Sequence, residues 1–362
     1  MDKHKHRTIL AIGFAKWRGC DPRALAQSFR GLGHALIEID AEDYIPWRWN
    51  NLFAKVFRKF FINALVRDYN NEILRIAHSS IFDFILVFKG KFLTPGTLVS
   101  LRKLNRPIYN FYPDVSFTDH GPLIAKSIKY YDCVFTTKSY HGANEIEKLQ
   151  IRELQYVRHG FDPEVHRPMK LTAEQMALYG SDVTFVGCWS ADKERTIMEL
   201  LNFRKSLKVL VYGIGWKRAD PAFINALGSN LRPGVFGDEL AIAYSAAKIN
   251  LGLLSSSAGD DSLSDETTAR TFQIPAAGAF MLHEDTPEIR TLFTPDEVMV
   301  FTDRNDLLQK VDSALANCAL RDTIRLKGHE RCVGVPYDYS AAAKSIIDKY
   351  SIDCGGVSEK QR

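Results

Sequence analysis

The sequence has no long apolar run and only six cysteines in 362 residues. A membrane-spanning helix needs about 18 consecutive apolar residues, and no stretch approaches that length. The most apolar N-terminal run, Ile9–Ala15, follows a basic start but has no small-residue cleavage site, so it predicts a buried strand and not a signal peptide. The cysteines stand singly, without a C-x-x-C pair or a clustered histidine. This spacing predicts no metal site and reduced thiols in a cytoplasmic protein.

Composition is that of a globular protein, with 46% hydrophobic and 25% charged residues, which excludes a disordered or fibrous chain. The length exceeds the roughly 300 residues at which one hydrophobic core stops growing, so two domains are expected. Charge is unevenly distributed: the first 170 residues carry nine excess positive charges and the remainder five excess negative charges. This asymmetry favours two domains that meet different partners.

Short apolar runs alternate with helix-like stretches along the whole chain, which predicts an α/β fold with parallel sheets covered on both faces. The first half is expected to hold strands at Thr8–Gly13, Ala35–Ile39, Phe82–Phe88, Pro107–Phe111, Cys133–Thr136 and Leu154–Val157. The second half is expected to hold strands at Val183–Val186, Val209–Tyr212, Ile249–Leu254, Ala279–Leu282 and Val298–Phe301.

The periodicity fades between His159 and Tyr179, where glycine, prolines and charges gather, as expected of a connection between domains. We therefore predict two Rossmann-like, doubly wound domains, residues 1–167 and 168–336, that face a central cleft. Residues 337–362 are predicted to form a C-terminal helix on the first domain and a frayed tail. Open α/β sheets bind ligands at the carboxyl ends of their strands, so functional residues are expected in the loops that follow them.

Two such loops in the second half carry glycines and basic residues. Gly187 ends a strand, and Lys193 and Arg195 lie in the first turn of the helix that follows. A helix N-terminus with basic side chains suits a phosphate, but the same pattern is typical of a solvated helix face. Tyr212 and Gly213 end the next strand, and the glycine fits either a tight turn or a backbone close to a ligand.

A third loop, Ser255–Leu282, leads into a short helix that carries Arg270 and Gln273. Their spacing places both on one helix face, where they can meet an anion and a sugar hydroxyl together. The alternative is a polar pair on the surface.

The phrases DVTFVG (182–187), RTFQIPAAG (270–278), GFDPEVHRP (160–168), and VFG (235–237) followed by AYSAAKINL (243–251) resemble those of the CgeB-like glycosyltransferases. These are relatives of the retaining nucleotide-sugar transferases of GT-B architecture. The resemblance covers most of the chain from about Phe82 to Tyr350. It implies that the second domain holds a nucleotide-sugar donor and the first an acceptor.

Residue by residue, the resemblance implies that Gly187, Lys193 and Arg195 contact the pyrophosphate, with Arg270 as the arginine of the family's R-x-F-E motif. Phe236 and Gly237 would meet the base, and Asp265 would stand near the first acid of the E-x7-E pair. Gln273 departs from the family, which usually has Glu at this position to bind the ribose hydroxyls. The loss of charge is expected to weaken donor binding by on the order of 1 kcal/mol.

Catalysis depends on whether the anomeric configuration is retained, which only the resemblance favours. A retaining transfer needs cations that neutralise the departing phosphate, for which Arg195 and Lys193 are the candidates. An inverting transfer needs a base, and the first domain offers Asp114 and, less well placed, His120. The alternative, which the neighbouring Pro113 favours, is that Asp114 caps a turn.

Acceptor binding is expected in the first domain, from Asp114 and from Lys89 and Lys91, which follow a strand and suit either an acceptor phosphate or a solvated turn. The helix predicted from Asn51 carries four phenylalanines and four basic residues before Asp68. Such a face can rest on an anionic membrane and suit a lipid-linked acceptor, or the phenylalanines can pack in the core. Outside this helix the sequence has no concentrated stripe of lysine and arginine with interleaved aromatics. A nucleic-acid partner is therefore not expected.

We therefore predict a cytoplasmic glycosyltransferase, with peripheral contact at the inner membrane face as an open alternative. It would move a hexose-type sugar from a UDP- or GDP-linked donor to a hydroxyl acceptor in polysaccharide or glycoconjugate biosynthesis, without a metal or organic cofactor. One alternative is a nucleotide-sugar epimerase or hydrolase with the same donor loops. A second is a non-catalytic nucleotide-sugar-binding protein, which Gln273 makes plausible.

Overall fold

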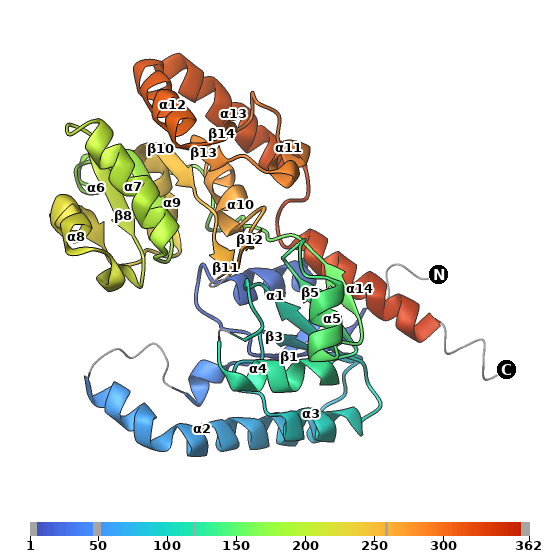
Figure 1. Ribbon diagram of the computed structural model, residues 1–362. Helices are drawn as coiled ribbons and strands as arrows, with labels where there is room; N and C mark the ends of the chain where they lie inside the picture. The colour runs from blue at the N-terminus through green and yellow to red at the C-terminus, as the bar shows by residue number, and fades with distance from the viewer. Residues whose placement is uncertain (1–5, 46–51, 119, 258–259, 356–362) are drawn as a thin grey trace. The chain divides into compact units, whose positions relative to one another are not determined.

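The computed structural model describes residues 6–45, 52–118, 120–257 and 260–355. The chain divides into two compact units (Figure 1). Unit 1 comprises Met1–Arg158 and Tyr339–Arg362, and unit 2 comprises His159–Asp338. No helix in the described ranges combines the length and hydropathy needed to cross a bilayer.

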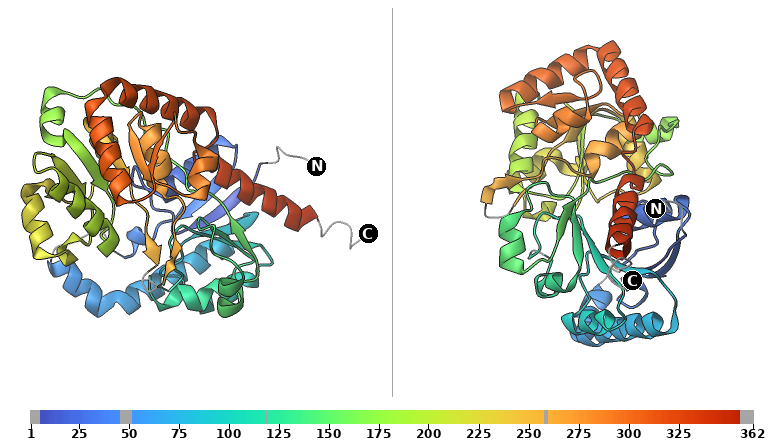
Figure 2. Two further views of the ribbon diagram at one scale, coloured as in Figure 1. Left: turned by 45° about the horizontal axis from the view of Figure 1, so that its top comes forward. Right: turned by 90° about the vertical axis from the view of Figure 1, so that its right-hand side faces the viewer.

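Unit 1 is built on a six-stranded parallel sheet in the order β2-β1-β3-β4-β5-β6. The strands are β1 (Thr8–Ile12), β2 (Ala35–Ile39), β3 (Phe84–Phe88), β4 (Ile108–Tyr112), β5 (Cys133–Thr136) and β6 (Leu154–Tyr156). The helices are α1 (Asp21–Gly31), α2 (Leu52–Ser79), α3 (Pro95–Arg102), α4 (Pro122–Ser127), α5 (Ala143–Leu149) and α14 (Ser340–Gly355). Helices α1 and α14 lie side by side on one face of the sheet (Figures 1 and 2). Helices α2, α3 and α4 cover the other face.

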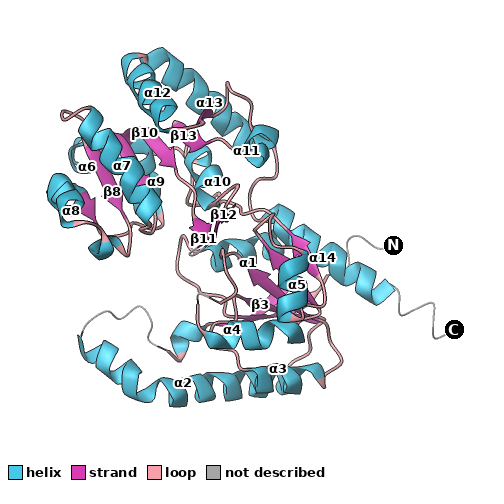
Figure 3. Cartoon of the chain, viewed as in Figure 1, coloured by secondary structure: helices cyan, strands magenta, loops and turns pink. Residues whose placement is uncertain are grey.

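Unit 2 repeats this plan with a six-stranded parallel sheet in the order β14-β13-β10-β7-β8-β9, drawn in magenta in Figure 3. Its strands are β7 (Ser181–Val186), β8 (Val209–Tyr212), β9 (Leu231–Arg232), β10 (Ala247–Gly252), β13 (Met281–Glu284) and β14 (Met299–Phe301), with a hairpin of β11 (Ser256–Ser257) and β12 (Asp260–Ser264). Its helices are α6 (Ala173–Tyr179), α7 (Ala191–Phe203), α8 (Pro221–Leu227), α9 (Asp238–Ala246), α10 (Ala269–Ala276), α11 (Pro287–Leu292), α12 (Arg304–Ala316) and α13 (Cys318–Gly334).

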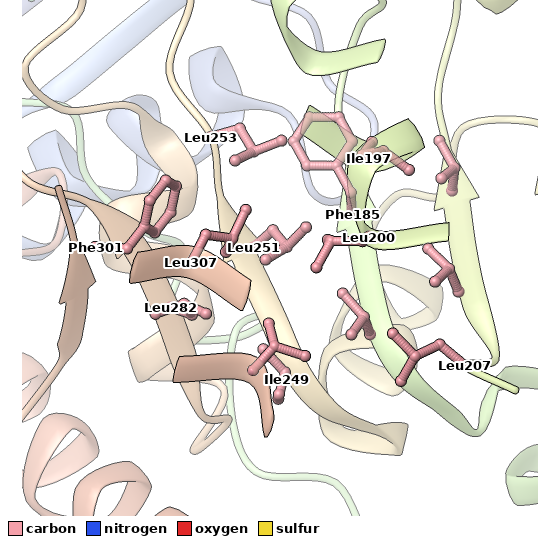
Figure 4. Packing of buried hydrophobic residues seen from close by; sticks show 14 of the residues in the cluster. Phe185, Ile197, Leu200, Leu207, Ile249, Leu251, Leu253, Leu282, Phe301 and Leu307 are labelled. Atoms are coloured by element: carbon pink, nitrogen blue, oxygen red, sulfur yellow. The ribbon is translucent and has the colours of Figure 1, made fainter. Parts of the chain in front are cut away.

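The core of unit 2 has one layer on each face of its sheet. On one face, Ile197 and Leu200 of α7 and Leu307 of α12 pack against Phe185 and Leu251 of the central strands (Figure 4). Residues of α9, α10 and α11 fill the other face. Because both faces are covered, the central strands are apolar on both sides, and the predicted doubly wound α/β fold is confirmed.

The division between the units falls at Arg158 and His159, nine residues before the boundary that the sequence suggested. The reason is packing within unit 2. Phe161 is buried in the same layer as Tyr212 and Phe272, and Pro168 lies against Gly278. The segment that looks like a linker in composition is therefore part of the second core.

Candidate functional site

The loop between β7 and α7 brings a lysine into the interior of unit 2. Gly187 follows β7, and the Ser190 hydroxyl caps α7 by accepting a hydrogen bond from the backbone N–H of Lys193 at 3.5 Å. The Lys193 side chain is turned inward, with only 4% of its surface exposed. Its ammonium donates to the Ser255 hydroxyl at 2.6 Å and to the Cys188 carbonyl at 3.4 Å. Among the side chains that the structure describes, no carboxylate forms an ion pair with it.

Arg270 of α10 lies beside this lysine at the carboxyl ends of β7 and β10. Its guanidinium donates to the carbonyls of Val186, at 3.2 Å, and Leu253, at 2.6 Å. It also stands 5.2 Å from the centre of the Phe185 ring. The buried Nε of Arg270 has no hydrogen-bond partner in the described residues. A Cβ at Gly187 would come within 2.8 Å of an Arg270 nitrogen, so glycine leaves the space that the guanidinium needs.

The electrostatics of this cluster follow from burial. Burial, and next the positive charge of Arg270, lower the pKa of Lys193 to about 8. Glu284, at the end of β13, accepts a hydrogen bond from the backbone N–H of Leu254 at 2.8 Å. Burial raises the pKa of this carboxyl, and Lys193 and Arg270 only partly oppose the shift. The cluster of Lys193, Arg270 and Glu284 thus holds two cations where access to water is restricted, and it could bind an anion.

The loops that follow β7 and β8 are hydrogen-bonded to each other next to the cluster. The backbone N–H of Gly187 donates to the Tyr212 carbonyl at 2.9 Å, and the Trp216 indole donates to the Gly187 carbonyl at 3.0 Å. A Cβ at Gly213 would lie 1.9 Å from the Gly187 carbonyl oxygen. Gly213 therefore serves a close approach of two chain segments. The Tyr212 hydroxyl accepts a hydrogen bond from Arg232 at 3.2 Å.

The remaining donor candidates of the sequence lie in different surroundings. Asp265 is buried, and its charge acts on Lys193. Gln273 is buried within α10. Phe236 is exposed, and Gly237, at a φ of +58°, precedes α9. Arg195 is exposed on α7 and forms an ion pair with Asp192 one turn earlier.

A second group of charged side chains lies at the carboxyl ends of β3 and β4 in unit 1. Asp114 forms an ion pair with Lys89 at 2.9 Å, and the Nε2 of His120 lies 3.2 Å from the same carboxylate. Lys89 has a φ of +59°, a strained conformation for a residue with a side chain. Lys91 is half-buried, and burial followed by the charge of Lys89 lowers its pKa. The structure thus brings Lys89, a predicted acceptor residue, together with Asp114 and His120, the two candidate bases.

Sequence reasoning missed two residues of the unit 2 cluster. Glu284 ends a strand at the same sheet edge as Gly187, which is a signal that could have singled it out. Ser255 offers no such signal, because a serine in a polar loop is commonplace. No group of three His, Cys, Asp or Glu side chains in the described part of the chain is arranged to hold a metal ion.

The two six-stranded parallel sheets, each covered by helices on both faces, form the two-domain architecture called GT-B. Residues 193–348 match the family model described as glycosyl transferase-like, a segment that contains Lys193, Arg270 and Glu284. No curated protein matches the chain.

Solved structures share the fold at low sequence identity. Sucrose-phosphate synthase from Thermosynechococcus elongatus is 14% identical with a TM-score of 0.65, covering 97% of this chain and 100% of its own. HepE from Anabaena in complex with UDP-glucose is 10% identical with a TM-score of 0.62, covering 96% and 100%. A putative UDP-N-acetylglucosamine 2-epimerase from Listeria monocytogenes is 10% identical with a TM-score of 0.51, covering 97% and 98%. These likenesses concern the fold.

Proposed function

We propose that the protein is a glycosyltransferase that takes a sugar from a UDP- or GDP-linked donor and transfers it to a hydroxyl. The observation that carries this proposal is the pair of Lys193, which is buried, and Arg270, which is partly buried. Both hydrogen-bond to neutral oxygens and have no carboxylate in an ion pair among the described side chains. A buried cation beside a partly buried one is costly unless an anion compensates them. A diphosphate supplies that charge.

In this proposal the diphosphate binds at the N-terminus of α7, where free backbone N–H groups and the helix dipole favour an anion. Lys193 is already oriented by Ser255, and Arg270 by two strand-end carbonyls. The exposed Phe236 is the candidate for the base, and Gln273 and Asp265 are the candidates for the sugar hydroxyls. The glycosyl transferase-like match and the UDP-glucose complex of a fold neighbour support this assignment.

The transfer breaks the bond between the anomeric carbon and the oxygen of the β-phosphate. Negative charge accumulates on the departing diphosphate, so preorganised cations lower the barrier. Lys193 and Arg270 are held in place for this role by their hydrogen bonds to Ser255 and to the Val186 and Leu253 carbonyls. Arg195, being exposed and paired with Asp192, is the weaker candidate. Retention of configuration remains a proposal that rests on the resemblance.

For the acceptor we propose the group in unit 1. Asp114 is the candidate base for an inverting reaction, with His120 hydrogen-bonding distance away. In a retaining reaction the same residues would orient the acceptor hydroxyl. Lys89 and Lys91 favour an acceptor that carries a negative charge.

The donor site is tested by titrating UDP, GDP, ADP, CMP and dTDP against the protein by calorimetry. We expect UDP or GDP to bind, and expect Lys193→Met and Arg270→Ala each to weaken binding at least tenfold. Arg195→Ala is expected to do less. Lys205→Met, which alters an exposed lysine beyond the other end of α7, is the matched control. If none of the nucleotides binds, the donor site is refuted.

A nucleotide-sugar epimerase or hydrolase is the second candidate, favoured by the epimerase among the fold neighbours. Incubation of the protein with UDP-sugars alone separates the two. Full conversion without an acceptor would refute the transferase. If Gln273→Glu gained a transfer activity that the natural sequence lacks, the chain would be a nucleotide-sugar-binding protein instead.

A further inference from the structure

The first half of α2 exposes a patch of large apolar side chains. The α2 patch consists of Val56, Phe57, Phe60 and Phe61, and Phe60 is 76% and Phe61 51% exposed. The rings of Phe57 and Phe61, one turn apart, have centres 4.8 Å from each other. The alternative that these phenylalanines pack in the core is contradicted by their exposure. The side chains of Phe53, Lys55 and Arg58 lie outside the described part of the structure.

The α2 patch faces away from the core of unit 1. The second half of α2 is anchored by Tyr69, Asn70, Ile73 and Ala77, which are buried. At about 100° per residue, these four side chains point about 160° away from the centre of the patch. Figure 1 shows the N-terminal end of α2 extending beyond α3, which packs beside the other end. Burial within unit 1 therefore cannot account for the patch.

The half of α2 that carries the patch is basic. From Leu52 to Arg67 the helix has four basic residues, at positions 55, 58, 59 and 67, and no acidic residue. Lys59 is exposed, and its side chain points about 130° from the centre of the patch, towards the side of the helix. The Arg67 side chain is 71% exposed and points in nearly the same direction as Phe60, with Asp68 as its ion-pair partner at 3.4 Å. The next acidic residue after Asp68 is Glu72, which is paired with Arg75.

We propose that the α2 patch docks on the surface of an anionic lipid bilayer. Aromatic side chains are suited to the boundary between headgroups and acyl chains. Each lysine or arginine near an anionic surface raises the membrane partition coefficient roughly fivefold. The positive charge of the first half of α2 selects this occupant, because a second copy of the same helix would bring like charges together. The helix lies on the surface and does not span the bilayer. The proposal is independent of the proposed donor site, which belongs to unit 2.

Co-sedimentation with lipid vesicles tests the proposal. We expect the protein to sediment with phosphatidylcholine vesicles that contain phosphatidylglycerol and to remain in the supernatant with pure phosphatidylcholine. Phe60→Ser with Phe61→Ser, and separately Lys59→Glu with Arg67→Glu, are each expected to lower binding at least tenfold. Because the altered side chains are exposed, the melting temperature is expected to stay within a few degrees, and nucleotide binding to stay unchanged.

Two variants serve as matched controls. Ile81→Ser removes another exposed apolar side chain of unit 1, and Lys103→Glu reverses the charge of another exposed lysine there. Both are expected to bind vesicles like the natural sequence. Equal binding to neutral and anionic vesicles, or no effect of the α2 variants, would refute the proposal. So would a dimer in sedimentation that Phe60→Ser with Phe61→Ser abolishes, or α2-dependent binding to single-stranded RNA without vesicle binding.

Discussion

Lys193 links ligand binding to protonation at the scale of a single residue. Its ammonium is buried beside Arg270, so its charge is lost at a lower pH than that of an ordinary lysine. A diphosphate bound between the two cations would restore the charge, because a nearby anion favours the protonated form. Binding and proton uptake are therefore coupled near pH 8.

We expect the affinity for UDP or GDP to fall as the pH rises through the pKa of Lys193. With that pKa at about 8, the dissociation constant should rise about tenfold between pH 7 and pH 9. Lys193→Arg keeps its charge throughout this range and should flatten the profile. Calorimetric titrations at several pH values measure this. An equally steep profile for both proteins would assign the titration to another group.

The same burial predicts that Lys193→Met stabilises the protein while it impairs binding. The lowered pKa means that the protonated lysine disfavours folding below pH 8, by about 3 kcal/mol if the shift to about 8 is taken at face value. Loss of the hydrogen bond to Ser255 returns about 1 kcal/mol. The net gain, about 2 kcal/mol at pH 7, should disappear between pH 8 and pH 10.5, as the unfolded lysine also loses its proton. Urea unfolding at pH 7 and pH 10 measures both values. Destabilisation at pH 7 would contradict the expectation.

The residues of the donor cluster illustrate how far the sequence reaches at this scale. Gly187, Lys193 and Arg270 were singled out by their places after a strand or near a helix N-terminus. The sequence could not predict which way each of these side chains points. On α7, Lys193 points inward and Arg195 points outward. Residues two positions apart on a helix differ by about 200° in direction. Which of the two faces the strand ends depends on how the whole helix packs.

At the scale of elements, the glycines after β7 and β8 decide how closely two loops and a helix meet. Gly187 lies against the ring of Phe185 and the guanidinium of Arg270, and Gly213 lies against the carbonyl of Gly187. Glycine at the end of β7 therefore leaves room for the guanidinium of Arg270, on α10, at the edge of the sheet.

We expect Gly187→Ala to displace Arg270 and weaken nucleotide binding at least tenfold. Its Cβ would lie 2.7 Å from Phe185 and 2.8 Å from Arg270, which should also cost about 1–3 kcal/mol of stability. Gly31→Ala is the control, because no atom lies within 4 Å of a Cβ there, and alanine at the end of helix α1 should be neutral or stabilising. Calorimetry and thermal melting measure the two effects. Unchanged binding by Gly187→Ala would show that Arg270 does not meet the nucleotide.

Elements were predicted well where they are buried on both faces. The runs at Phe82–Phe88 and Val209–Tyr212 contain β3 and β8, because a central parallel strand must be apolar on both sides. The hairpin of β11 and β12 was missed, since its sequence from Ser255 to Ser264 is small and polar. A hairpin outside the main sheets leaves no apolar periodicity to detect.

At the scale of the whole molecule, two buried histidines make stability depend on pH. His166 accepts a hydrogen bond from the Asp162 backbone N–H at 2.9 Å, and His283 lies between the Thr271 hydroxyl, at 2.9 Å, and the Glu284 carbonyl, at 2.6 Å. Burial lowers the pKa of each to about 4. Both are therefore neutral in the folded protein at pH 7.

We expect the free energy of unfolding to fall as the pH drops from 6.5 towards 4. In this window the two histidines take up protons in the unfolded chain but not in the folded chain. Their contribution to stability is therefore fully present above pH 6.5 and is lost on acidification. Between pH 7 and pH 5 each histidine should contribute about 2 kcal/mol to the loss, from a pKa of about 4 in the folded state. Urea unfolding at several pH values measures the slope. His166→Gln should reduce it, and His78→Gln, which alters an exposed histidine of α2, should not.

The sequence by itself determined the class of fold, because alternating apolar strands and helices admit few packed arrangements, and glycines at strand ends mark where a backbone must pass closely. Tertiary structure alone decided which side chains are buried. Lys193 and Arg270 are 77 positions apart in the sequence and become neighbours because β7 and β10 pair in the sheet. Phe57, Phe60 and Phe61 of α2 face outward because its second half is the part anchored to the core. Burial and its electrostatic consequences depend on contacts between distant segments, and no local pattern of residues contains that information.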